Sequence, residues 1–162
     1  MREIEVLSFG TIAELAERLP LRSRYFQFLL AWDAPDKTPQ QLMSFFRPLV
    51  ERGLVYFCAW GGNCEAVHGA VDRCDIERRP ETRHADYIMM TTWHSDESLE
   101  EALWFFKVCA LPRESTDPSE CDRFSVAIGS SAWSIEMKKA LKSIEGDADD
   151  EIEPVECDTD EI

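Results

Sequence analysis

The chain alternates between short apolar runs and segments in which apolar residues recur at helical spacing. Three of the apolar runs end in a tryptophan that is followed at once by a polar turn. Runs that are apolar on both faces are typical of parallel strands covered by helices. The expected strands are Tyr25–Trp32, Leu54–Trp60, Tyr87–Trp93 and Phe124–Ile128. If these strands are parallel, their ends gather at the carboxyl edge of the sheet, where open α/β sheets bind ligands.

Helical segments separate these runs, and three of them begin with capping-box spacing. Thr11 and Glu14 form the first box, Thr38 and Gln41 the second, and Ser98 and Glu101 the third. Gly53 stands where a helix C-terminus requires a residue with positive φ. The expected helices cover residues 11–19, 39–52, 64–74, 99–110 and 132–144, with an edge strand over 3–9 and loops over 75–84 and 113–122.

The alternation predicts a three-layer α/β fold, Rossmann-like or doubly wound, with a mainly parallel sheet of four to five strands and flanking helices. A chain of 162 residues fits one domain with a substantial core. We expect residues 1–144 to form a single α/β domain. We expect residues 145–162 to form an acidic, disordered tail, since they contain too few apolar residues to build a core.

The net charge of −15 is concentrated at the carboxyl terminus. Ten acids and no Lys or Arg lie in residues 145–162, so the remaining residues carry only −5. Neither part offers the basic surface that phosphate neutralisation requires, which disfavours direct nucleic-acid binding. An acidic tail is typically solvating, but it is also suited to contacting a basic partner protein.

The sequence indicates a cytoplasmic protein. No apolar run reaches the roughly 18–20 residues of a membrane helix, and the first residues lack the basic and apolar regions of a signal peptide. The six cysteines include no C-x-x-C pair and no metal-ligand spacing, so we expect free thiols and neither metal nor cofactor. Cys58 and Cys109 lie inside apolar patterns and are expected in the core.

The sharpest local signal for a ligand is the turn formed by Gly61, Gly62 and Asn63 after the second tryptophan-ended run. Two glycines let a ligand approach the backbone closely, and the following helix N-terminus favours anions. The motif is neither G-x-G-x-x-G nor a Walker A loop. A tight turn that uses glycine for its geometry, with Asn63 as the helix cap, is the competing interpretation.

Three reactive side chains follow three different strands. Cys64 lies at a helix N-terminus, where the dipole lowers a thiol pKa. With His94 as base and Asp33 as orienting acid, it would form a nucleophilic site. The alternative is that Cys64 is an ordinary small residue and His94 an exposed turn residue.

Tryptophans and serines complete the candidate binding surface. Trp32, Trp60 and Trp93 occupy equivalent strand ends and either seal the core or line a recognition surface. Ser130 and Ser131 either cap the last helix or form an anion nest.

Three functions remain open from the sequence. The favoured one is a small acidic binding or regulatory protein, of an immunity or defence-adaptor type, that acts through contacts with a partner protein. The others are an enzyme with the Cys64, His94 and Asp33 site, and a degenerate nucleotide or anion sensor. The stretch from Met89 to Phe106 resembles small uncharacterised bacterial proteins, which implies a bacterial origin and no activity.

Overall fold

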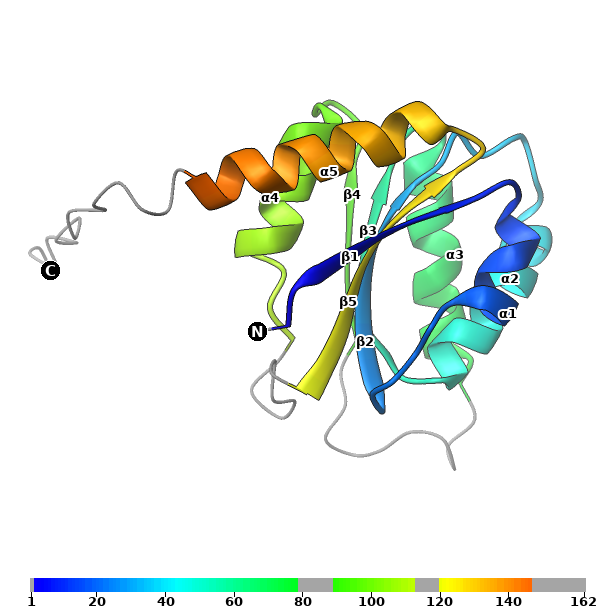
Figure 1. Cartoon of the computed structure of the whole chain (residues 1–162). Coiled ribbons are helices and arrows are strands. Elements are labelled where there is room, and N and C mark those ends of the chain that lie inside the picture. Colours follow the sequence, from blue (N-terminus) through cyan, green and yellow to red (C-terminus); the bar gives the residue numbers. More distant parts are fainter. Residues whose placement is uncertain (1, 79–88, 113–119, 147–162) are drawn as a thin grey trace, which may run out of the picture.

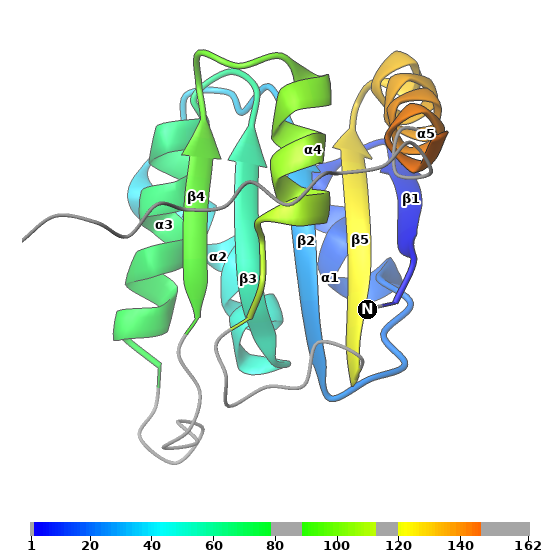
Figure 2. The ribbon, with the colours of Figure 1, turned by 90° about the vertical axis from the view of Figure 1, so that its left-hand side faces the viewer.

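Five strands form a single sheet in the computed structural model, which describes residues 2–78, 89–112 and 120–146. Every neighbouring pair is parallel, in the order β1-β5-β2-β3-β4. Figure 2 shows the arrowheads of β3, β4 and β5 at the same edge of the sheet. The strands are β1 (Ile4–Phe9), β2 (Tyr25–Ala31), β3 (Leu54–Trp60), β4 (Met90–His94) and β5 (Cys121–Ile128). The predicted Rossmann-like α/β fold with a parallel sheet is therefore confirmed.

Helices cover both faces of the sheet, as the two-sided apolar strands require. The first face is covered by the 3-10 turn η1 (Ile12–Glu14) and by α1 (Leu15–Arg18), α2 (Pro39–Glu51) and α3 (Cys64–Ile76). The second face is covered by α4 (Leu99–Val108) and α5 (Ser131–Gly146). Figure 1 shows these helices on opposite sides of the strands. Each face has its own core, with Phe28, Phe46 and Phe57 on the first and Leu29 and Phe106 on the second.

Local capping fixes the helix starts. Thr38 Oγ1 accepts a hydrogen bond from Gln41 N at 3.3 Å, and Gln41 Oε1 accepts one from Thr38 N at 2.9 Å. Ser98 and Glu101 form the same reciprocal pair at the start of α4. Asn63 does not cap α3 as expected, because it lies in the left-handed region with φ 61° and its side chain makes no capping hydrogen bond.

Two expectations at the ends of elements are wrong. β5 begins at Cys121, inside the expected loop 113–122, because its polar residues are buried and paired rather than exposed. Arg123, for example, donates to the carbonyl oxygen of Phe106. Cys109 is exposed, because α4 ends at Val108 and the chain turns there, whereas Cys58 is buried as predicted. Residues 145 and 146 of the expected disordered tail belong to α5, and the rest of that tail, residues 147–162, lies outside the described residues.

The connections change face at β5, and this determines where a site can form. The segments after β1 and β2 lead to helices on the first face, whereas the segment after β5 leads to α5 on the second. Neighbouring strands whose connections diverge leave a crevice at their carboxyl ends, which is the usual ligand position in open α/β sheets.

Candidate functional site

An open cleft of about 700 Å³ lies at this switch point, at the carboxyl ends of β1, β5 and β2. We call it the carboxyl-edge cleft. The turn after β1, the β2–α2 loop and the β5–α5 turn line it. Figure 1 shows these three connections at its upper right. Its lining residues are Gly10, Thr11, Ile12, Ala13, Trp32, Asp33, Pro35, Lys37, Phe45, Ile128, Gly129, Ser130 and Trp133. The volume is within the range of ligand pockets, about 300–1,000 Å³.

Aromatic rings form walls of the cleft. Trp32 is buried, and its ring meets that of Phe45 edge to face at 6.3 Å between centroids. Trp133, at the start of α5, is held edge to face against Trp60 at 5.5 Å. The indole N–H of Trp60 is fixed in turn by a 2.9 Å hydrogen bond to the carbonyl oxygen of Glu97. These contacts orient the rings before any ligand arrives.

Two of the lining residues carry ionisable side chains, and their charges are opposite. Lys37 places its Nζ 5.7 Å from the centroid of the Phe45 ring, which is a cation–π distance. Asp33 accepts a 2.7 Å hydrogen bond from Gly62 N through Oδ1. Among the described residues, no hydrogen bond reaches the other carboxylate oxygen of Asp33. The cleft therefore combines apolar walls with one cation and one available acceptor.

The β2–α2 loop of the same chain, and not a ligand, packs closely against the backbone of Gly61 and Gly62. Trp32 N donates to Trp60 O at 3.0 Å, and Ala34 N donates to Gly62 O at 3.0 Å. A Cβ atom on Gly61 would lie 2.6 Å from the Trp32 carbonyl oxygen. Gly61, Gly62 and Asn63 do not line the cleft, but Gly61 and Gly62 hold Trp32 and Asp33 in its wall.

The structure does not assemble a nucleophilic triad from Cys64, His94 and Asp33. Cys64 is packed in the core of the first face. The His94 ring points to the second face, 4.9 Å from the Phe105 ring, with Nδ1 2.7 Å from a Glu97 carboxylate oxygen. Asp33 pairs with the glycine turn instead of with His94.

The pKa of Cys64 also differs from the expectation of an activated thiol. Burial raises the pKa of this thiol, and this effect outweighs the opposing backbone hydrogen bonds from His94 and Glu65. The predicted lowering by the helix dipole is therefore wrong, because the side chain is only 3% exposed. Cys64 and His94 do not line the cleft.

The strand-end tryptophans lie on different faces because their strands are offset in register. Trp60 pairs with Ala31 on one side and with His94 on the other. Trp32 and Trp93 are thus each one residue out of step with Trp60, and side chains alternate between faces along a strand. Trp32 lines the cleft, whereas Trp93 is 46% exposed on the outer strand and packs against the tilted His68 ring at 4.7 Å between centroids.

The two serines of the β5–α5 turn have different positions. Ser130 lines the cleft, and its Oγ accepts a 3.4 Å hydrogen bond from Trp133 N at the start of α5. Ser131 is exposed outside the cleft, and its carbonyl oxygen accepts a 2.8 Å bond from the Ser134 hydroxyl. Capping accounts for the contact of Ser130, and the helix N-terminus opens beside the cleft.

Sequence reasoning named Trp32, Asp33 and Ser130 of the cleft and missed Ala13, Lys37 and the other lining residues. The missing signal is the strand order. Local patterns do not reveal that β1 lies beside β5, so the turn after β1 could not be placed at the site. The one local clue in the sequence would have been Lys37, a cationic residue in the loop that follows Trp32 at the end of β2.

Other kinds of site find no support in the described part of the chain. There, no group of three or more His, Cys, Asp or Glu side chains is placed to hold a metal ion. Likewise, none of the helices within the described ranges has the length and apolarity needed to cross a membrane.

Fold and cleft together define the class: a Rossmann-like α/β protein with an aromatic-walled cleft at the switch point of its sheet. The family model described as "Domain of unknown function (DUF7684)" matches residues 4–144, so the chain belongs to this family. No curated protein and no solved structure matches the chain.

Proposed function

We propose that this protein is a non-catalytic binding or regulatory protein that engages a partner protein at the carboxyl-edge cleft. The observation that carries the proposal is the cleft itself: rigid aromatic walls at the switch point, with the candidate nucleophile Cys64 and base His94 packed elsewhere. Partly exposed aromatics held in fixed positions are typical anchors of protein interfaces.

Charge and thiol chemistry support the same proposal. A net charge of −15 favours encounter with a basic partner surface. The five described cysteines are free thiols, as in a reducing compartment. A small acidic cytoplasmic protein of the immunity or defence-adaptor type would have these properties, and binding to its partner would be its activity.

A nucleotide or anion sensor is the second candidate, and one observation favours it. The N-terminus of α5 opens beside the cleft, with Ser130 and Lys37 nearby in the lining. The N-terminus of α2, which follows the β2–α2 loop of the cleft, is unsuited to binding phosphate. Thr38 and Gln41 already satisfy each other there, and Pro39 supplies no N–H. We therefore rank the sensor below the protein-binding function.

Blocking the cleft tests the proposed function. Ala13 lines the cleft and is exposed, so Ala13→Trp fills it without disturbing the core. Ala66 is exposed on α3 outside the cleft, and Ala66→Trp is the matched control. With tagged full-length chains as bait in the native host, we expect Ala13→Trp to reduce recovery of the specific partner at least about ten-fold, the loss of a central anchor contact.

The control variant should recover the partner at the unmodified level. Equal recovery by both tryptophan variants, with both folded by circular dichroism, would show that the partner binds elsewhere and would overturn the proposal.

A further inference from the structure

We propose that the carboxyl-edge cleft recognises a cationic side chain, arginine or lysine, presented by the partner protein. The inference rests on the proposed function and specifies the chemistry of the partner. It follows from two features of the cleft and one of the whole domain. In the cleft, the Phe45 ring already contacts a cation and the Asp33 carboxylate has an available oxygen. The domain, residues 1–144, has a net negative charge.

The aromatic wall already binds a cation from the same chain. Lys37 Nζ lies 5.7 Å from the centre of Phe45, and that ring is supported edge to face by Trp32. Attraction between a cation and a ring face reaches about 6 Å. Lys37 is half-buried on a loop, and a guest cation can replace it over Phe45 by moving only its flexible side chain.

Asp33 supplies the second half of the recognition. Its Oδ1 is held by Gly62 N at 2.7 Å, so the carboxylate has a fixed position in the cleft wall. The other oxygen has no hydrogen-bond partner among the described residues. A carboxylate next to aromatic faces is a suitable partner for a guanidinium, which stacks on rings and donates hydrogen bonds in its plane.

The overall charge favours the same sign of ligand. Residues 1–144 contain all 17 Lys and Arg and have a net charge of −5, so a cation is attracted towards this body. An anion would instead have to approach Asp33. Lys37 and the α5 N-terminus favour an anion in the same cleft, and the sign of the ligand charge is therefore the quantity to measure.

The experiment is an NMR titration of the isotopically labelled full chain with three probes. N-acetyl-arginine amide carries the proposed cation, N-acetyl-citrulline amide is its neutral isostere, and inorganic phosphate is the competing anion. The readouts are the indole N–H signals of Trp32 and Trp133 and the backbone signals of Lys37. We expect saturable shifts with the arginine probe and at least about three-fold weaker binding of the citrulline probe, consistent with an exposed cation–π contact.

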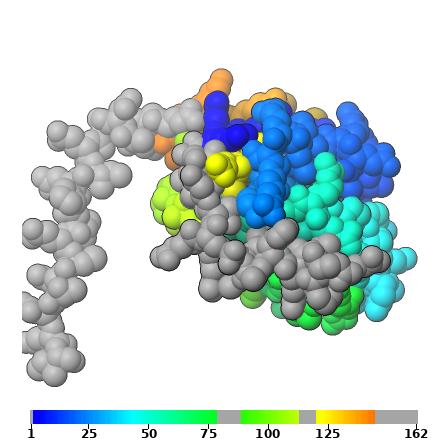
Figure 3. Space-filling model, turned by 90° about the horizontal axis from the view of Figure 1, so that it is seen from below, coloured from blue at the N-terminus to red at the C-terminus, as the bar shows by residue number. Residues whose placement is uncertain are grey.

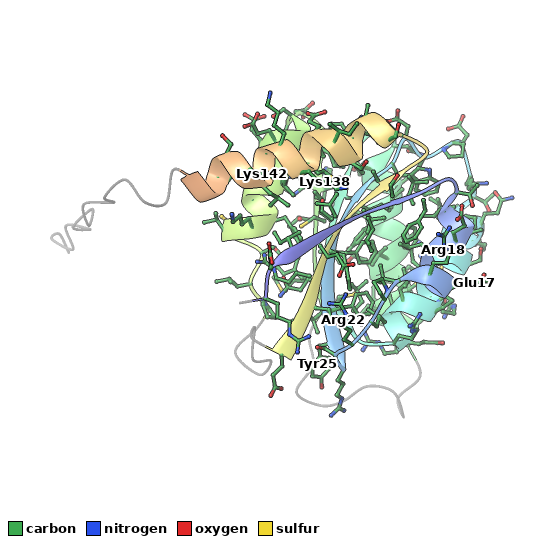
Figure 4. All side chains as sticks on the ribbon, viewed as in Figure 1. Glu17, Arg18, Arg22, Tyr25, Lys138 and Lys142 are labelled. Atoms are coloured by element: carbon green, nitrogen blue, oxygen red, sulfur yellow. The ribbon has the colours of Figure 1, made fainter. Side chains whose placement is uncertain are left out.

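Variants that change the charge of the cleft test the sign of the ligand charge independently of the comparison between probes. Lys37→Gln removes the resident cation, so it should tighten binding of the arginine probe about three-fold. Asp33→Asn keeps an oxygen for Gly62 N but loses the negative charge, so it should weaken this binding. Lys142→Gln is the control, since it makes the same charge change as Lys37→Gln on the exposed surface of α5. Figure 4 shows Lys142 away from the β5–α5 turn. This variant should leave binding of the arginine probe unchanged.

Two results would overturn the inference. In the first, phosphate is the only probe that shifts these signals and binds Lys37→Gln more weakly, so that the cleft is an anion site. Alternatively, none of the probes shifts the cleft signals while Ala13→Trp still abolishes partner capture. The protein-binding function would then stand, and the cationic recognition would be wrong.

Discussion

Gly61→Ala is expected to destabilise the protein by about 3 kcal/mol, because two independent constraints meet at this residue. Its φ is +107°, a conformation that residues with a Cβ rarely adopt. The added Cβ would also lie 2.6 Å from the carbonyl oxygen of Trp32, which belongs to the backbone and cannot move aside cheaply. The substitution therefore pushes the β2–α2 loop away and disturbs the cleft wall that Trp32 and Asp33 form.

The same substitution at Gly69 is the matched control. Gly69 is exposed within α3, and a Cβ there meets nothing within 4 Å. Gly69→Ala should stabilise the protein by about 0.5–1 kcal/mol through helix propensity. Urea unfolding of both variants measures the difference. A Gly61→Ala midpoint equal to that of the unmodified protein would show that the two loops are not held at this distance.

Asp122→Ala is expected to cost about 3 kcal/mol at neutral pH, because the buried carboxylate satisfies two backbone groups at the amino edge. Oδ2 of Asp122 accepts hydrogen bonds from Arg22 N at 2.6 Å and Ser23 N at 2.7 Å, and Oδ1 pairs with Arg2 at 2.7 Å. Figure 3 shows the start of β5, in yellow, beside the blue residues that precede β2. Figure 4 labels Arg22 and Tyr25 in this region.

The loss should depend on pH in a defined direction. Burial raises the pKa of Asp122, but hydrogen bonds from Arg22, Ser23 and Arg2 outweigh it and hold the pKa below its usual value of 3.8. A lowered folded-state pKa contributes stability that is present above about pH 4 and lost as pH falls through the folded-state pKa. The difference in unfolding free energy between the unmodified protein and Asp122→Ala should therefore shrink below about pH 4.

Glu5→Gln provides the control for a simple ion pair. Glu5 pairs with the side chain of the same Arg22 at 2.7 Å, but both side chains are substantially exposed. Its removal should cost less than about 1 kcal/mol. Comparable losses for the two variants in urea unfolding would contradict the assignment of Asp122 as the acceptor that holds the start of β5.

Much of the fold could be predicted because it depends on local patterns. The capping boxes at Thr38 and Ser98 determine helix starts through contacts between residues three apart. The apolar runs of β2 and β3 determine buried strands within one residue of the expected ends. β5 is the exception, since Asp122 and Arg123 are polar in sequence and buried only through partners distant along the chain.

The candidate site was harder to predict because it depends on distant pairing. The offset of one residue between Trp32 and Trp60 decides which face each indole occupies, and only the β2–β3 register contains that information. The separation of Cys64 from the His94 ring has the same origin, since side chains that follow neighbouring strands can point to opposite faces. The cleft itself needs β1 beside β5.

The central claim is that the carboxyl-edge cleft is the surface through which this protein recognises its partner. Hydrogen–deuterium exchange of the full chain, free and in complex with the captured partner, tests it most directly. The proposal predicts protection concentrated in residues 10–13, 33–37 and 129–133, which come together only at the cleft. Protection confined to α4 and the residues that follow it, where Trp104, Val108 and Leu111 are exposed, with these three segments unchanged, would contradict it.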